Sequence, residues 1–265
     1  MSLASEARRT RRYDMPIGFG PSLIPDRSEI PHAEVVGLSF LTEADALRAL
    51  LPEGLDLAGD PVVSVSCIDY RGVDYMGGRG YLEIVVSFPA RLVLGSESLT
   101  GGYAPVLWVS DFGALYAGRE YMGLPKLLAT FETSAGEGTR SFACAEYGNR
   151  LLEGRATELT PLSDEQLARV RARSQEVRTF GWKHIPSDRG EPDADYPLIN
   201  VMRWEYTRAW SGRSEIEWHG LDAIAAPFSS RIIAALSRLP ILEYKRSFVA
   251  EGRAVIDRSA TRRVG

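Results

Sequence analysis

The sequence is organised around one central stretch, which reads Gly118-Arg119-Glu120-Tyr121-Met122-Gly123-Leu124-Pro125-Lys126-Leu127-Leu128. Its lysine is uncommon here, because only three of the 31 basic residues are lysines (Lys126, Lys183 and Lys245) and the rest are arginines. Arginine keeps its charge, whereas a desolvated lysine can lose its proton and act as an amine nucleophile. Lys126 is therefore the first candidate for chemistry. The alternative at this point is a strand-edge lysine whose amine extends to solvent.

Composition restricts the class of protein around this stretch. A length of 265 residues allows one large or two modest domains, and the 45% hydrophobic and 25% charged content is typical of a globular protein. A net charge of −4 gives no indication of a nucleic-acid partner. No apolar run approaches the roughly 20 residues that span a bilayer. We therefore expect no membrane partner and a cytoplasmic location.

The cysteines and histidines indicate neither a disulfide nor a metal site. Cys67 and Cys144 lie in apolar, strand-like segments, so we expect buried free thiols and no disulfide. His32, His184 and His219 are far apart and show no metal-ligand spacing, so we expect no metal site. No phosphate-binding loop or Gly-x-Ser-x-Gly elbow is present, so neither a nucleotide cofactor nor a serine hydrolase is indicated.

Hydrophobic patterning predicts a β-rich chain. Short strands separated by glycine-bearing turns are expected at 35–41, 62–68, 81–88, 103–110, 128–133, 141–147, 151–159, 198–209, 214–218 and 241–256. Helices are expected near 42–51, over 161–174 behind a Ser163–Gln166 capping box, and after Pro227. Because few helices interleave with the strands, the pattern favours an antiparallel sheet or barrel.

A second candidate residue, Glu83, lies inside one of these strands. By strand alternation its side chain shares a face with Tyr81 and Val85. If both faces of the sheet are covered, Glu83 is buried and suits a general acid. If only one face is covered, Glu83 points into water. The pattern leaves both interpretations open.

These residues resemble a known family. Gly118-Arg119-Glu120, followed after four residues by Pro125-Lys126, resembles the signature around the Schiff-base lysine of the acetoacetate decarboxylase family. Tyr81-Leu82-Glu83 is similar to that family's Tyr-x-Glu, which carries an acidic active-site residue. Weaker similarities extend the resemblance from about Met15 to Asp257.

The resemblance implies an α+β fold, with a largely antiparallel, cone-like β-barrel and outer helices, in a single domain over residues 1–265. The polar ends, 1–14 and 258–265, are expected to be flexible tails. The resemblance also implies a homo-oligomeric lyase without cofactor or metal, acting on a small keto acid. It assigns catalysis to Lys126 and Glu83, and substrate binding to Glu120, Arg119 and Tyr81. A structural pairing of Arg119 with Glu120 is the alternative for those two residues.

Two departures from the family pattern concern recognition and activation. The decarboxylase, a known example of an amine activated by desolvation or by a neighbouring cation, has a second lysine where this chain has Leu127. Its substrate-binding arginine aligns with Ala33. A keto-acid carboxylate therefore needs another cation here, which could be Arg79, Arg91 or another arginine.

Three functions remain open. The first is a decarboxylase-like lyase that forms a Schiff base with a small keto acid. The second is an aldolase-dehydratase that condenses pyruvate with an aldehyde through a lysine enamine, and the departures at Leu127 and Ala33 favour this group of relatives. The third is a non-catalytic barrel that binds a small ligand, for which the lysine motif would be a coincidence.

Overall fold

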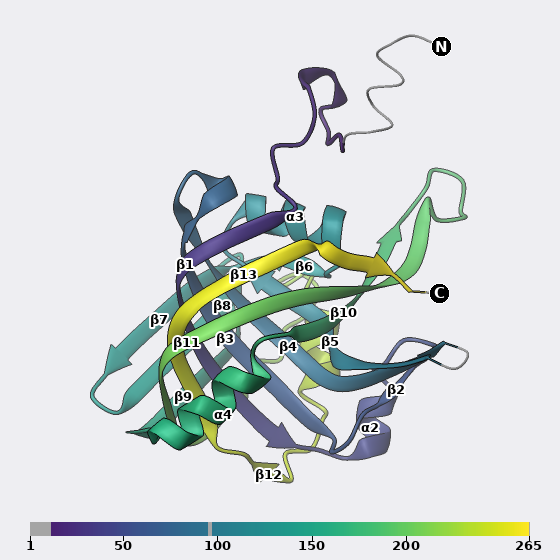
Figure 1. The fold of residues 1–265 in the computed structure, drawn as a ribbon. Helices are drawn as coiled ribbons and strands as arrows, with labels where there is room; N and C mark the ends of the chain where they lie inside the picture. Colours follow the sequence, from purple (N-terminus) through teal and green to yellow (C-terminus); the bar gives the residue numbers. More distant parts are fainter. Residues whose placement is uncertain (1–11, 95–96, 265) are drawn as a thin grey trace.

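The structure, a computed structural model, describes residues 12–94 and 97–264 (Figure 1). Strands dominate it. The helices are α2 (Ala44–Arg48), α3 (Phe112–Met122), α4 (Asp164–Arg173) and α5 (Ser230–Leu236), with short turns η1 (Ile17–Phe19) and η2 (Asp74–Met76). The strands are β1 (Arg27–Leu41), β2 (Leu55–Leu57), β3 (Val62–Val73), β4 (Arg79–Leu94), β5 (Glu97–Val109), β6 (Lys126–Leu128), β7 (Thr130–Gly136), β8 (Thr139–Glu146), β9 (Asn149–Pro161), β10 (Val177–Ile185), β11 (Ala194–Trp218), β12 (Glu243–Tyr244) and β13 (Ser247–Arg263).

The main strands follow the order β10-β5-β4-β3-β1-β13-β11-β9-β8-β7. Because β10 also pairs with β11, the first seven strands of this order close into a ring. The 25-residue β11 has three partners: it pairs with β13 along one edge, and along the other its first part pairs with β10 and its last part with β9. Pairing is antiparallel except where β10 and β6 join β5. The predicted α+β, largely antiparallel architecture is confirmed.

Apolar side chains fill both faces of the central strands. On β3, Cys67 joins one core while the next residue, Ile68, joins a second core on the opposite face. On β4, Ile84 belongs to the first core and Tyr81 to the second. The second core also receives Ala114 and Met122 of α3. Where a strand is covered on both faces, neighbouring side chains are buried in opposite cores, and this decides the environment of Glu83.

The N-terminus of α4 and the two cysteines agree with the sequence pattern. Helix α4 begins with the predicted capping box, in which Ser163 and Gln166 exchange side-chain and backbone hydrogen bonds. Cys67 and Cys144 are buried free thiols, as expected. No helix among the described residues is long and apolar enough to cross a membrane.

The prediction of a flexible tail from residue 258 is wrong. Strand β13 continues to Arg263 because β11 offers a pairing edge there, with Leu198 opposite Arg263. The yellow β13 and green β11 run side by side over this length in Figure 1. Of the other expected tail, residues 1–11 lie outside the described residues. That the chain forms a single domain stays a prediction.

Candidate active site

A helix that the sequence patterning did not predict, α3, leads into the lysine segment. Asp111 caps its start by accepting a hydrogen bond from the Gly113 N–H at 2.7 Å. Gly123 ends it in the left-handed conformation, with φ of 60°. Glycines and aromatic residues inside 112–122 lower its helix propensity, which is why periodicity alone missed it. The cap residues Asp111 and Gly123 were the available signal.

Strand β6 then places Lys126 beneath this helix. β6 runs parallel to β5, with Lys126 opposite Leu107, and the carbonyl of Pro125 accepts the Leu107 N–H at 3.2 Å. The lysine side chain lies against Gly118. A Cβ at Gly118 would stand 2.5 Å from both Cδ and Cε of Lys126 and 3.2 Å from its Nζ. The motif glycine therefore makes room for the lysine.

Lys126 and Glu83 form a buried pair. The lysine Nζ lies 2.6 Å from Oε2 of Glu83, and each side chain is only 6% exposed. Glu83 lies in the middle of the sheet, opposite Val109 of β5 and Ile68 of β3. It does not point into water, so the buried interpretation of Glu83 is the correct one. This Oε2 has no conventional hydrogen-bond partner among the described residues, and the amine is its close polar contact.

Tyrosine rings wall the pair. The Lys126 Nζ lies 5.6 Å from the centre of the Tyr81 ring, and the Tyr70 ring centre is 4.8 Å from that of Tyr81. Burial raises the pKa of both phenols well above their ordinary value, and the Glu83 carboxylate raises it further. The hydroxyl groups therefore stay protonated. Tyr70 was not singled out from the sequence, although it alternates with Ile68 on the same face of β3.

The remaining predicted site residues lie away from the amine. Arg119 is exposed, and its Nη1 donates to the backbone carbonyl of Lys126 at 3.3 Å. The Glu120 carbonyl accepts a hydrogen bond from Lys183 Nζ at 2.6 Å. No ion pair joins Arg119 to Glu120 within the described ranges. The arginine thus supports the β6 backbone, and the structure brings together Lys126, Glu83 and Tyr81 from the predicted set.

The structure also shows where the two residues that depart from the family pattern, Leu127 and Ala33, are located. Leu127 packs against the first core, on the face opposite to Lys126. Ala33 is buried in the second core and lies beside Tyr70 across the β1–β3 ladder. Of the proposed substitute cations, Arg79 is exposed and donates to the Met76 carbonyl, while Arg91 pairs with Asp56 at 3.3 Å. Neither is placed at the Lys126–Glu83 pair.

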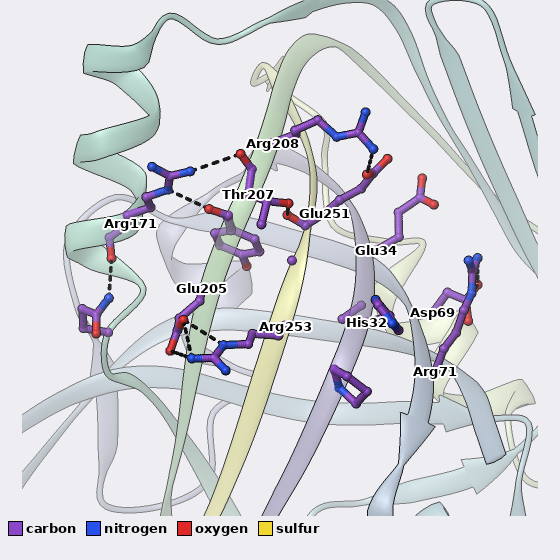
Figure 2. A pocket seen from close by; sticks show the side chains of 15 residues that line it. His32, Glu34, Asp69, Arg71, Arg171, Glu205, Thr207, Arg208, Glu251 and Arg253 are labelled. Carbon is purple, nitrogen blue, oxygen red and sulfur yellow. Dashed lines mark hydrogen bonds and ion pairs between the residues drawn. The ribbon is translucent and has the colours of Figure 1, made fainter. Parts of the chain in front are cut away.

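A charged surface groove of about 880 Å³ lies where α4 borders β1, β3, β11 and β13 (Figure 2). Its arginines are held by other groups of the protein. Arg253 makes two 2.8 Å hydrogen bonds to Glu205, Arg208 pairs with Glu251, and Arg171 donates to the Tyr206 carbonyl at 2.7 Å. Neither Lys126 nor Glu83 lines this groove, and its arginines Arg171, Arg208 and Arg253 already have protein partners.

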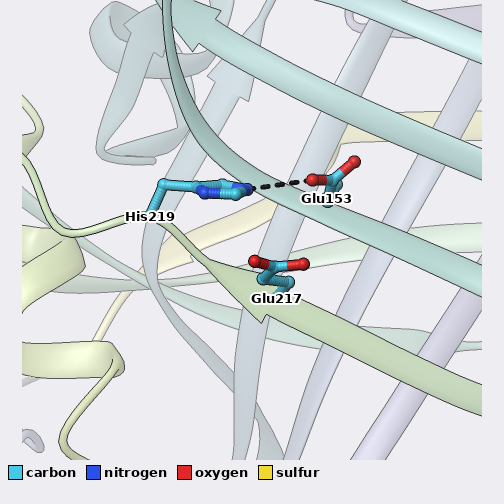
Figure 3. Close-up of side chains that lie close together, drawn as sticks. All are labelled: Glu153, Glu217 and His219. Carbon is cyan, nitrogen blue, oxygen red and sulfur yellow. Dashed lines mark hydrogen bonds and ion pairs between the residues drawn. The ribbon is translucent and has the colours of Figure 1, made fainter.

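A histidine and two carboxylates meet at another surface position, which the sequence spacing did not indicate (Figure 3). Glu153 of β9 and Glu217 of β11 are cross-strand neighbours, and His219 follows β11. His219 Nε2 lies 3.0 Å from Glu153, whose other oxygen is 3.2 Å from Arg150. The charge on Glu153 is therefore already compensated by protein groups.

The chain is similar to proteins of one known family. A family model described as acetoacetate decarboxylase (ADC) matches residues 14–259. The chain belongs to this family. The acetoacetate decarboxylase of Burkholderia vietnamiensis (strain G4 / LMG 22486) is 25% identical over 262 residues, covering 94% of this chain and 91% of the relative. Family membership supports a decarboxylase-like lyase that acts on a small keto acid.

Solved structures share the fold of this family member. The crystal structure of acetoacetate decarboxylase from Legionella pneumophila subsp. pneumophila superposes with a TM-score of 0.74 at 20% identity, covering 93% of this chain and 92% of that one. The enduracididine biosynthesis enzyme MppR, complexed with the condensation product of pyruvate and imidazole 4-carboxaldehyde, superposes with a TM-score of 0.71 at 17% identity, covering 95% of each chain. These likenesses concern the fold.

Proposed function

We propose that this chain is a lyase that forms a Schiff base between Lys126 and a small keto acid. The observation that carries the proposal is the buried contact of 2.6 Å between the Lys126 amine and the Glu83 carboxylate. Two opposite charges that are removed from water lose much of their hydration. Proton transfer from the ammonium to the carboxylate replaces them with a neutral amine and a carboxylic acid, which is the reactive form of the lysine.

The reaction follows from this proton transfer. The amine lone pair attacks the ketone carbon, and the carbonyl oxygen takes up a proton to give a carbinolamine. Loss of water then gives an iminium. Glu83 is the acid and base within reach of these steps, because its Oε2 lies beside the nitrogen. Arg119, through its bond to the Lys126 carbonyl, steadies the β6 backbone that carries the amine.

The iminium nitrogen accepts the electron pair released at the neighbouring carbon. In a 3-oxo acid that pair comes from the bond to the departing CO2, and the enamine formed is then protonated at carbon and hydrolysed. This sequence is the decarboxylase-like outcome, and membership in the acetoacetate decarboxylase family supports it.

A second outcome uses the same lysine. In pyruvate the electron pair comes from a C–H bond, and the resulting enamine attacks an aldehyde before water is lost. Leu127 faces the first core where the decarboxylase has its second lysine, so Lys126 has no adjacent cation from that position. MppR has been solved with a condensation product of pyruvate and an aldehyde, and it shares this fold. These observations favour an aldolase-dehydratase as the second candidate.

Borohydride trapping tests the proposal. The protein is incubated with acetoacetate or with pyruvate, reduced, digested and mapped by mass spectrometry. An isopropyl group on Lys126 after acetoacetate, together with released CO2, identifies decarboxylation. A carboxyethyl group after pyruvate, without CO2 from acetoacetate, identifies the aldolase-type enamine.

The three lysines of the chain provide the controls. Lys126→Ala should abolish the adduct. Lys245→Arg should retain it, because Lys245 pairs with the exposed Glu243 at 2.7 Å and not with the Lys126–Glu83 pair. An adduct that is absent with both acids, or that lies equally on Lys183, contradicts the proposal and leaves the ligand-binding barrel as the interpretation. Homo-oligomer formation and a cytoplasmic location stay predictions, which gel filtration and cell fractionation can check.

A further inference from the structure

Arg258 of β13 is a buried cation that the proposed chemistry does not use. It is 5% exposed and forms no ion pair with any residue in 12–94 or 97–264. Its Nη1 donates to the Pro25 carbonyl at 3.0 Å and to Ser28 Oγ at 2.6 Å. Its Nε is buried and has no hydrogen-bond partner among the same residues. A guanidinium that is dehydrated without a counter-ion costs free energy unless an anion binds to it.

The strand register directs this cation toward the candidate active site. By alternation along β13, Arg258 shares a face with Ala254 and Ile256, which both pack in the second core. The same core contains Tyr81, whose ring borders the Lys126 amine. The Arg258 side chain is therefore on the active-site face of the sheet.

The phenol of Tyr75 is influenced by both Arg258 and Glu83. The Arg258 Cζ lies 4.9 Å from the centre of the Tyr75 ring. Burial raises the pKa of Tyr75 to about 12, Arg258 lowers it, and the Glu83 carboxylate raises it. The same two charges act in opposite directions on Tyr81. Arg258 and Glu83 thus lie within electrostatic reach of the same two phenols.

A surface cleft leads to this arginine from the side away from the lining of the Lys126–Glu83 pair, since neither of those two residues lines it. Arg258 lines a cleft of about 460 Å³ between the N-terminal segment and α3, together with Tyr116, Tyr121 and Thr261. A cleft of this size accommodates a small organic acid. Its other charged lining residues are Arg12, Asp14, Glu120 and Lys183, and Arg12 is already paired with Asp26.

We propose that Arg258 binds the carboxylate of the keto acid whose carbonyl carbon is attacked by Lys126. The inference rests on the proposed function. A residue of β13 then binds the substrate carboxylate, which the apolar Ala33 of β1 cannot bind. Carboxylates suit an arginine because the planar guanidinium presents several N–H groups to their two oxygens.

Binding of the carboxylate by Arg258 also affects whether a C–C or a C–H bond of the substrate is broken. Decarboxylation converts the bound carboxylate into neutral CO2, so the contact with Arg258 is weakened as the transition state is approached. Deprotonation next to the iminium keeps the carboxylate and its contact. Interactions that are stronger in the ground state than in the transition state slow a reaction. Arg258 therefore favours 2-oxo acids that are retained as enamine donors over 3-oxo acids that lose CO2.

The test compares a charged and a neutral ketone. Trapping on Lys126 is measured against concentration for pyruvate and for methyl pyruvate, in the wild type and in Arg258→Gln. We expect the half-saturating concentration of pyruvate to rise about 10- to 100-fold in the variant, the effect of losing a hydrogen bond to a charged group. Methyl pyruvate, which lacks the carboxylate, should be trapped equally by both proteins. Arg258→Lys should recover part of the pyruvate effect.

Controls separate recognition from folding. Arg262→Gln removes an exposed arginine of the same strand, which pairs with Glu97, and should leave pyruvate trapping unchanged. Equal weakening of both ketones in Arg258→Gln, or no change in either, overturns the inference while the Schiff-base function stands. If the wild type forms no adduct, calorimetric titration with pyruvate decides. Binding that is lost in Arg258→Gln retains the arginine role without the Schiff base, and an absence of binding to the wild type overturns both.

Discussion

Gly118→Ala places a methyl group directly against the side chain of the proposed nucleophile. The new Cβ would lie 2.5 Å from Cδ and Cε of Lys126, whereas carbon atoms in contact prefer about 3.5–4.0 Å. The lysine side chain must therefore move by about 1 Å, because the opposing atoms belong to it and the α3 backbone is fixed by its hydrogen bonds. Misplacing a reacting group by this amount costs about 100-fold in rate.

Stability should respond much less than the reaction does. Alanine is a better helix former than glycine by about 1 kcal/mol, and overpacking opposes this by about 1–3 kcal/mol. The two contributions largely offset each other, so we expect the free energy of unfolding to change by no more than about 2 kcal/mol. Urea denaturation monitored by circular dichroism measures this change.

The assay is the rate of borohydride-trapped adduct formation on Lys126 at saturating keto acid. Gly113→Ala is the matched control in the same helix, since a Cβ there would meet the Asp111 carboxylate at 3.1 Å and not the lysine. A Gly118→Ala protein that is folded and traps substrate at the wild-type rate would refute the argument that this glycine positions the amine.

Three further outcomes follow from the same contacts. Glu83→Gln keeps the side-chain volume but removes the proton acceptor, so trapping should slow by about 100-fold or more, and an unchanged rate argues against a proton-transfer role. Lys126→Met leaves Glu83 buried without its cation, so urea titrations should show a free energy of unfolding that is lower by about 3 kcal/mol. Adding Glu83→Gln to this variant should recover part of the loss. A double variant that is no more stable than Lys126→Met would contradict the pairing. Burial raises the pKa of the Cys144 thiol to about 12 and that of Cys67 further, so a thiol reagent at mildly alkaline pH should label neither before unfolding, and rapid labelling of the native protein would be the opposite result.

The strand-rich architecture and the residues of the central pair were accessible from the sequence because they depend on local pattern. Alternation placed Glu83 and Tyr81 on one face of a strand, and the lysine motif singled out Lys126. Whether that face was covered was not accessible, since it depends on α3 and on strands far away in the chain. Helix α3 was missed because Gly113 and Gly118 weaken its helical signal, although Gly118 is required by the lysine that it contacts.

The burial of Arg258 in an ordered strand could not be predicted from the local sequence pattern either. A polar, basic segment near the end of a chain is typical of a frayed tail. The segment is ordered because β11 is long enough to pair with it, and a pairing between residues 198 and 263 leaves no local trace in either segment. Arginine content alone therefore indicated flexibility where the register produces burial.

The three-residue strand β6 has a consequence for how this protein can vary. Its adjacent residues face opposite ways, with Lys126 against the tyrosine wall and Leu127 in the first core. Inserting or deleting one residue in the turn at Gly123–Pro125 would exchange the two faces, burying a cation among apolar side chains and withdrawing the amine from Glu83. Packing of Leu127 in the first core thus fixes the register of β6 and, with it, the position of the Lys126 amine. The length of this turn should be less tolerant of change than its composition.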